Sequence, residues 1–531
     1  MGGYNRNLKM NNIATNEQVT QTSPAIRNSK TAGHIPEEIQ PLVDQVLEAH
    51  EHTTVLRPAT TNDGIRKLKG FQKQRFRRIY KKRARNYSYV KFIPALQQTR
   101  TLFQRIEEFA AEYDPDEEHF SHFINRTGLF TVQEFFKQLK HLPFYSVIKD
   151  DVRAINLSSR SSDEKKLAIA KHITETIGSS LMALPLGLLP YGTLNQKTLT
   201  ALDLQVTQFK RQQDDFKDAW LHLHISEDSK QQFYDAVETY HARNEQQEIR
   251  PLNAAFSFAE DQRTYPIVDE DGAPVTNRDG ELCWAQDYTQ CALENLNEVP
   301  CEIVHLTPID NVGGPSEDKV CLRMRQEMTG MLMFITKRMH FFRQKLEDGN
   351  LTRARRLRLK KFLKRYLHVN LKNYLNLHTG STEQALKELM DRPIRVVGVA
   401  AGTPDDALRP YWSQDTTGIE RLQLVSDHSL DLQRPSQQRA LNSSTHYSPQ
   451  HMVGSLRDYT GEAYDLRDFA QSGPGVVHHG THGDKETKTI QPHGLLEGQM
   501  DGWNTMFMEV DHTCDSGVHE VMDLLKVDRN R

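Results

Sequence analysis

The sequence predicts an α+β protein of several domains, with a mostly helical N-terminal two-thirds, a small β-ribbon and a small C-terminal α/β domain. Three observations lead to this prediction. The chain has 531 residues, more than one core usually organises. Apolar residues recur at helical spacing in several stretches between Ile39 and Gln247. From Ile394 onward, short β-branched runs are bounded by glycine and proline, as is typical of buried strands.

Changes in composition and periodicity divide the chain into five predicted segments. The first is rich in Asn, Thr, Gln and Ser and has too little apolar surface to fold. The third contains short extended runs that glycine turns separate. The segments are a disordered leader over 1–34, a helical domain over 35–250 with a basic segment at 66–91, a β-ribbon and loop region over 251–320, a helical hairpin with a basic amphipathic helix over 321–392, and a candidate catalytic α/β domain over 393–531.

Within the last two segments the pattern is specific enough to place single elements. An apolar stripe of Met, Leu, Ile and Phe predicts a helix that ends near Gly349, and a second helix follows it. The predicted helices are 322–346, 351–377 and 450–469, and the predicted strands are 394–401, 422–425, 476–477 and 506–510.

Composition excludes several classes of protein. Lys+Arg 67 against Asp+Glu 70 gives a formal charge of -3, so an electrostatic partner must bind a local patch. The longest apolar run, Leu181–Leu189, is far shorter than the roughly 20 residues that span a bilayer. The five cysteines form no C-x-x-C pair, which argues against a disulfide framework or a thiolate zinc site. We expect no metal and no cofactor, and a location in the cytoplasm or export without a cleavable signal peptide.

The basic segment is the first candidate binding site. It contains no acidic residue and interleaves its cations with aromatic residues, a pattern that suits phosphate neutralisation combined with base stacking. A second basic stretch covers 353–365. Possible partners are an acidic protein, nucleic acid or an anionic lipid surface, and the alternative is a solvated helix whose aromatics face its own core. The predicted binding residues are Arg66, Lys67, Lys73, Arg75, Arg77, Arg78, Lys81, Lys82, Arg83 and Arg85.

A cysteine and a histidine near the C-terminus form the second candidate site. A short apolar run from Val476 leads to His479 and Gly480, and another from Met506 leads to Cys514. If two strands delivered these residues to one sheet edge, the histidine could act as a base that activates the thiol.

Residues 394–517 resemble the caspase-like cysteine peptidases, legumains and metacaspases in particular. In that family a His-Gly closes one strand, and a Cys followed by an acidic residue or His, then Ser and Gly, closes the next. The resemblance implies that His479 is the general base, Cys514 the nucleophile and Gly480 the donor of an oxyanion-hole amide, with a peptide as substrate. One departure is that only 17 residues follow Cys514.

The predicted function is therefore an effector-like, multidomain bacterial protein with a cysteine-dependent hydrolase domain, although enzymatic activity itself stays open. One alternative is a non-enzymatic helical adaptor that binds through the basic segments. A second is a nucleotide-transferring effector, because Ser455, His493 and Glu497 fit the Ser…His-x-x-x-Glu pattern of a bacterial AMPylase family. Substrate and oligomeric state cannot be inferred from the sequence.

Overall fold

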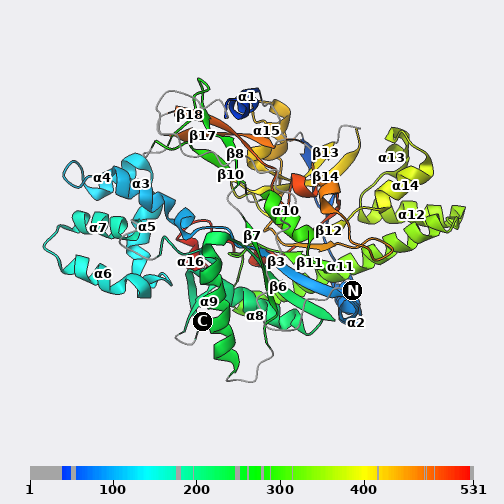
Figure 1. The fold of residues 1–531 in the computed structure, drawn as a ribbon, viewed down its shortest axis with the longest axis horizontal. Helices are drawn as coiled ribbons and strands as arrows, with labels where there is room; N and C mark the ends of the chain where they lie inside the picture. The colour runs from blue at the N-terminus through cyan, green and yellow to red at the C-terminus, as the bar shows by residue number, and fades with distance from the viewer. Residues whose placement is uncertain are drawn as a thin grey trace.

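The structure is a computed structural model of the whole chain (Figure 1). It describes residues 39–48, 55–174, 181–194, 197–245, 251–259, 262–276, 280–287, 289–313, 315–414, 418–471, 473, 475–482 and 485–526. The predicted leader over 1–34 lies outside these residues.

A large mixed sheet forms the centre of the molecule. Its strands run in the order β2-β19-β12-β16-β11-β3-β6-β7, and β15 pairs with β12 beside this path. β16 is antiparallel to both of its neighbours, and every other adjacent pair in the order is parallel. The strands are β2 (Ile65–Arg66), β3 (Ser88–Pro94), β6 (Asp218–Ser226), β7 (Ala254–Ala259), β11 (Ile303–Leu306), β12 (Ile394–Ala401), β15 (His446–Tyr447), β16 (Met452–Ser455) and β19 (Asn504–Glu509).

The winding of the chain changes direction between β3 and β11. From β3 the chain adds β6 and then β7 on one side, and it then returns to place β11 on the other side of β3. Helices α2 (Gly70–Arg83), α8 (Ala201–Gln213) and α9 (Lys230–Glu245) pack on one face with the larger apolar core. The return helix α10 (Thr289–Asn297) packs on the opposite face with the second core. β3 and β11 are therefore the topological switch point of a doubly wound sheet.

A lobe of short helices is inserted between β3 and β6 and lies at the left of Figure 1. Its core is rich in aromatic rings, with Phe109 contacting Tyr113, Phe120 and Phe123 at centroid distances of 4.9, 5.5 and 5.7 Å. Such contacts allow five helices of 13 residues or fewer to hold together. They are α3 (Gln104–Glu112), α4 (Phe120–Thr127), α5 (Phe130–Gln138), α6 (Tyr145–Leu157) and α7 (Ser162–Thr174).

The longest helix, α11 (Pro315–Glu347), crosses α2 at very close range. A Cβ atom at Gly330 would lie 2.1 Å from the Phe76 carbonyl oxygen, so only glycine permits this crossing. Three further helices follow α11 and lie at the right of Figure 1, namely α12 (Arg353–Tyr366), α13 (Leu371–Leu377) and α14 (Thr382–Met390).

Smaller sheets surround the central one. One has the order β1-β13-β14, another the order β17-β18-β9, and two are antiparallel pairs. Their strands are β1 (Val55–Pro58), β13 (Leu408–Gln414), β14 (Glu420–Ser426), β9 (Val268–Asp269), β17 (Val476–His482), β18 (Lys485–Gln491), the pair β4 (Pro190–Leu194) and β5 (Lys197–Thr200), and the pair β8 (Gln262–Pro266) and β10 (Trp284–Asp287). The remaining helices are α1 (Gln40–Glu48), α15 (Pro435–Asn442) and α16 (Asp523–Lys526).

The chain is thus a mixed α/β protein with several sheets, with which a multidomain description is compatible. The predicted helix over 450–469 is wrong, because this stretch forms β16 and an irregular loop. The predicted helix over 351–377 is two helices, α12 and α13, separated at His368, which adopts a positive φ of 55°. Strands of the central sheet come from three of the predicted segments, and the domain boundaries themselves remain a prediction. In the described part of the chain, no helix is long and apolar enough to cross a membrane.

Candidate functional site

His479 and Gly480 lie in β17, within the three-stranded sheet β17-β18-β9 at the top of Figure 1. His479 is opposite Lys488 in the antiparallel pairing with β18, and its side chain is exposed. Cys514 instead follows β19 of the central sheet, in a single 3-10 turn over His512–Cys514. The two residues predicted to form a catalytic pair therefore belong to different sheets.

The surroundings of Cys514 do not activate its thiol. The residue is 1% exposed and belongs to the main apolar core. A hydrogen bond with the Cys321 thiol, followed by burial, raises the pKa of Cys514 far above its usual range. A nucleophilic cysteine needs the opposite, a lowered pKa and access to solvent.

Alkylation tests this assignment directly. We expect iodoacetamide at neutral pH to modify Cys283, which is half-buried, faster than Cys514, because a buried thiol with a raised pKa presents almost no thiolate. Mass spectrometry of tryptic peptides from the folded protein would give both rates. His479→Ala should leave the rate at Cys514 unchanged. A rate at Cys514 above that at Cys283 would contradict the buried position.

The residues of the AMPylase-like pattern lie in a strand of the central sheet and in the turn that precedes β19. Ser455 ends β16, where it lies opposite Ile303 and Ile394 inside the sheet. Glu497 accepts hydrogen bonds from the backbone N–H of Ser426 and the hydroxyl of Ser429, at the end of β14. Burial raises the pKa of Glu497 to about 7. His493 is buried, with its ring against the backbone of Gly498.

The predicted basic residues are mostly on the surface. Lys73, Arg75, Arg78, Lys81 and Lys82 project from α2 into solvent. The interleaved aromatic residues turn the other way, because Phe76 and Tyr80 are buried in the core below the helix. The structure therefore brings the cations together on one surface and leaves most of the aromatic rings unavailable for base stacking.

A buried basic cluster, which sequence reasoning missed, lies at the switch point of the sheet. Lys91 of β3 and His305 of β11 are register partners on adjacent strands, and each is 1% exposed. The ring of His305 lies 5.8 Å from that of His451, which precedes β16. Arg325 reaches the cluster from α11. We call Lys91, His305, His451 and Arg325 the switch-point cluster.

Hydrogen bonds link the cluster to α8. Gln208 Oε1 accepts from both Lys91 Nζ at 3.3 Å and Arg325 Nη1 at 3.1 Å. Arg325 also donates to Gln212 Oε1 and Asp318 Oδ1, and Arg211 forms a second ion pair with Asp318. Two guanidinium groups, those of Arg325 and Arg211, therefore share the carboxylate of Asp318, so positive charge is in excess in this hydrogen-bonded group.

Burial makes this excess of positive charge costly. Burial, together with Arg325, holds the pKa of Lys91 well below its usual value, although Asp318 acts in the opposite direction. Burial also lowers the pKa of His305 well below its usual range and that of His451 to about 3. His305 Nε2 and His451 Nδ1 have no hydrogen-bond partner within the described residues. Because His451 Nε2 donates to the Cys514 carbonyl, its open Nδ1 carries a lone pair and can donate to an anion only after the ring takes up a proton.

Loops at the carboxyl ends of the strands cover the cluster. Asn311, in the loop after β11, donates to the Pro449 carbonyl and accepts from the Ser516 N–H. Asp310 accepts from the Val518 N–H, and His451 Nε2 donates to the Cys514 carbonyl at 3.0 Å. The C-terminal segment 511–518 is thus attached to the edge of the sheet by side-chain hydrogen bonds.

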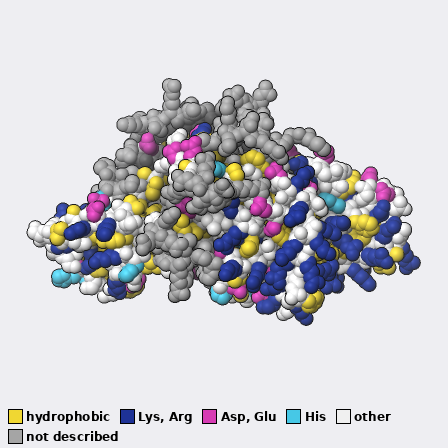
Figure 2. Space-filling view, turned by 90° about the horizontal axis from the view of Figure 1, so that it is seen from below, with side chains coloured by type: hydrophobic (Ala, Val, Ile, Leu, Met, Phe, Trp, Pro, Cys, Tyr) yellow, Lys and Arg dark blue, Asp and Glu magenta, His cyan; other side chains and the backbone are white. Residues whose placement is uncertain are grey.

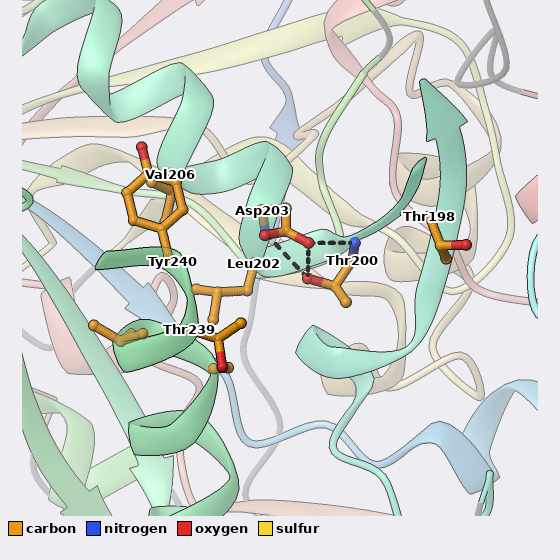
Figure 3. Close-up of a pocket in the computed structure, with 9 residues that line it drawn as sticks. Thr198, Thr200, Leu202, Asp203, Val206, Thr239 and Tyr240 are labelled. Carbon is orange, nitrogen blue, oxygen red and sulfur yellow. Dashed lines mark hydrogen bonds between the residues drawn. The ribbon is translucent and has the colours of Figure 1, made fainter. Parts of the chain in front are cut away.

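A separate pocket of about 260 Å³ lies between α8 and α9 (Figure 3). Its polar residues Thr200 and Asp203 bond to each other, because they form the N-terminal capping box of α8. The remaining lining includes Leu202, Val206 and Tyr240. Two of the polar residues of this pocket therefore already serve the helix end, and we do not assign it a ligand.

Sequence reasoning missed the switch-point cluster for identifiable reasons. Lys91 was counted as one more cation of the basic segment, whereas its strand neighbours Val90 and Phe92 mark a buried β-strand. His305 and His451 stand singly in short apolar stretches. The signal that could have found Lys91 is a lone lysine inside the otherwise apolar run from Tyr89 to Ile93.

Comparison with known proteins gives a family and several distant structures. The model of the family described as "Domain of unknown function (DUF4301)" matches residues 22–530. No curated protein sequence matches the chain. Among solved structures, a putative UDP-N-acetylglucosamine pyrophosphorylase from Entamoeba histolytica has 9% identity and a TM-score of 0.37, with 86% of this chain and 81% of that chain covered.

A point mutant of UDP-glucose pyrophosphorylase from Leishmania major is also similar, with 10% identity and a TM-score of 0.33 over 65% of this chain. The match spans 61% of that chain, which is less than two thirds of its length. The resemblance to caspase-like peptidases is wrong, as is the cysteine-hydrolase function that it implied. His479 lies in β17 of a small sheet, whereas Cys514 is buried beyond the end of β19 of the central sheet, so the implied catalytic residues do not share a site.

Proposed function

The chain belongs to the DUF4301 family, a domain of unknown function, and from this premise we propose that it binds a phosphate-bearing ligand of the nucleotide class at the carboxyl ends of β3 and β11. The observation that carries the proposal is the position of Lys91 and His305 as register partners at the switch point. In open α/β sheets, ligands bind outside the carboxyl ends of the strands at such a point.

The charge of the switch-point cluster supports an anion rather than a neutral ligand. Lys91 and Arg325 can donate charge-assisted hydrogen bonds to phosphate oxygens. An anion nearby raises the pKa of Lys91, His305 and His451, which burial otherwise lowers. Binding should therefore be accompanied by proton uptake, and the affinity should be higher at pH 6 than at pH 8.

The ligand must displace part of the cover over the cluster, because Lys91 and His305 are buried in the described state. The segment 511–518 is the element proposed to move, since hydrogen bonds to Asp310 and Asn311 hold it at the edge. Of the functions considered from the sequence, nucleotide transfer is nearest to this proposal. The proposed site is the switch-point cluster and not Ser455, His493 and Glu497. A cytoplasmic location, or export without a cleavable signal, is also part of the proposal; the five cysteines, all within the described residues, form no disulfide.

Titration calorimetry with the whole chain tests the proposal. The probes are UTP, UDP, ATP and UDP-glucose, which differ in base, in the number of phosphates and in the presence of a sugar. We expect Lys91→Met to weaken binding at least about tenfold, since a lost hydrogen bond to a charged group costs about 1.5–3 kcal/mol. Two buffers of different ionisation enthalpy would report the protons taken up.

Lys140→Met on the surface of the helical lobe is the matched control and should bind as the wild type does. Lys91→Met should also remain folded, because methionine fills a similar volume and removes a buried cation that has no direct carboxylate partner among its described hydrogen bonds. The proposal fails if no probe binds the wild type, or if Lys91→Met binds every probe with unchanged affinity and proton uptake.

A further inference from the structure

A second, independent feature is a large basic surface on three helices, which we call the basic face. Figure 2 shows its dark-blue side chains gathered over the right half of the molecule. α12 contains no acidic residue, and none occurs between Arg66 and Lys91. The exposed members are Lys73, Arg75, Arg78, Lys81 and Lys82 of α2, Lys319, Arg323, Lys337 and Arg338 of α11, and Arg353, Arg356, Arg358, Lys360, Lys361, Lys364 and Arg365 of α12.

The three helices form a rigid platform for these charges. Phe334 of α11 lies between them, with its ring 6.1 Å from Phe76 of α2 and 5.3 Å from Tyr366 of α12. The guanidinium of Arg75 stacks 4.8 Å above the Phe334 ring. The close crossing at Gly330 fixes the distance between α2 and α11. The cations therefore project from a packed surface and not from a loop.

A pocket of about 310 Å³ lies in the basic face between α2 and α11. It is lined by Arg77, Arg78, Lys81 and Arg323, together with Gln74 and Gln326. Arg77 is paired with Glu327 at 3.5 Å, whereas Arg78, Lys81 and Arg323 have no ion pair with a described residue. Three cations that form no ion pair with a described residue surround this pocket, which makes it complementary to a phosphate group, although Glu327 lies near enough to interact with Arg323.

The arrangement of apolar side chains decides between classes of polyanion. Phe76 and Tyr80 of α2 and Leu359, Phe362 and Leu363 of α12 are buried in the core. The large apolar side chains exposed on the described part of these helices are few, namely Phe71 of α2, Val320 and Phe341 of α11 and Leu357 of α12. None of the three helices therefore exposes the broad apolar face with which an interfacial helix enters a bilayer. Among the rings of α2 only Phe71 is exposed, at 69%, so the same described surface lacks a platform for stacking successive single-stranded bases.

We propose that the basic face binds the phosphate backbone of double-stranded nucleic acid. Helices that offer many cations but few exposed rings suit a duplex, whose bases are already stacked and whose phosphates are regularly spaced. The formal charge of -3 of the whole chain does not prevent binding to a duplex, because acidic residues outside the basic face are screened from the phosphates beyond a Debye length of about 8 Å.

Fluorescence anisotropy with labelled 20-base-pair RNA and DNA duplexes tests this proposal on the whole chain. At 50 mM salt we expect binding to at least one duplex, with log K falling linearly with log salt concentration. The triple variant Arg78→Gln, Lys81→Gln, Arg323→Gln should weaken binding at least about tenfold and reduce the salt slope by about 2 to 3, since each phosphate contact contributes about 0.9.

The matched control is Lys140→Gln, Lys149→Gln, Arg153→Gln, which removes the same charge from the exposed surface of the helical lobe. It should retain the affinity and the slope of the wild type. Equal losses in both variants, no duplex binding at 50 mM salt, or tighter binding to phosphatidylserine vesicles or polyglutamate than to either duplex would overturn the proposal. Lys91→Met should bind duplexes as the wild type does. A failure of the duplex proposal can therefore be distinguished from a failure of the proposed nucleotide site.

Discussion

Replacing Gly330 with alanine is expected to lower the free energy of unfolding by about 3 kcal/mol, at the upper end of what overpacking in a core usually costs. The new Cβ would lie 2.1 Å from the Phe76 carbonyl oxygen and 2.7 Å from its carbon. Both are backbone atoms, so no side-chain rotation relieves the contact. α2 and α11 would have to separate, and the packing of Met331 and Phe76 in the core would loosen with them.

Urea unfolding followed by circular dichroism would measure this change. Gly70→Ala is the control, because a Cβ at Gly70, the first residue of α2, meets nothing within 4 Å. That substitution should stabilise the protein by up to about 0.5 kcal/mol through the lower entropy of the unfolded chain. If Gly330→Ala changed stability by no more than Gly70→Ala does, the close crossing of the helices would be incorrect.

Acid should destabilise the protein well above the pH at which most carboxylates titrate. Burial lowers the pKa of His222 and of His451 to about 3. The unfolded chain takes up protons at these residues below about pH 6.5, whereas the folded chain does so only near pH 3, so stability is lost as the pH falls through this window. At pH 5 the two histidines together should lower the free energy of unfolding by about 4 kcal/mol, since each lowers it by about 1.4 kcal/mol for every pH unit below about 6.5.

The double variant His222→Gln, His451→Gln isolates this contribution. Its loss of stability between pH 7.5 and pH 5 in urea titrations should be smaller than that of the wild type by about 4 kcal/mol. Glu497→Gln is a control of opposite sign, because the pKa of Glu497 is raised to about 7 and its ionisation destabilises the folded state as the pH rises. At pH 8 the free energy of unfolding of Glu497→Gln should exceed that of the wild type by about 3 kcal/mol, and this difference should disappear as the pH falls toward 4.5. Parallel pH profiles for the two variants would contradict these assignments.

The sequence was sufficient where one periodicity extended over many residues. The strand predicted over 394–401 is β12, and the helix predicted over 322–346 lies within α11. The strands predicted over 422–425 and 506–510 correspond to β14 and β19 within a few residues. The basic segment was recognised because charge needs no knowledge of the fold, although which partner it binds remains a proposal.

The central sheet could not be assembled from the sequence because its strands in the first 310 residues are separated by helices, and two of them, β2 and β11, are short. β11 has four residues, and β3 includes Lys91, which weakens the apolar signal of a buried strand. The switch-point cluster depends on the pairing of β3 with β11 across more than 200 residues of chain. Local patterns carry no information on such a register, so two apolar runs that lead to His479 and Cys514 suggested a shared sheet edge, whereas the topology keeps the two residues apart.

The position of β19 between β12 and β2 also determines when the molecule can complete its fold during synthesis. Ile65 pairs with Phe507, and Val397 pairs with the same residue from the other side. Until β19 has left the ribosome, β2 has no partner in the sheet and one edge of β12 is open. Roughly 100 residues separate β12 from β19, which at about 5–20 residues per second corresponds to about 5–20 s. During that interval the nascent chain exposes a β-branched edge strand, the kind of surface to which chaperones bind and from which aggregation starts.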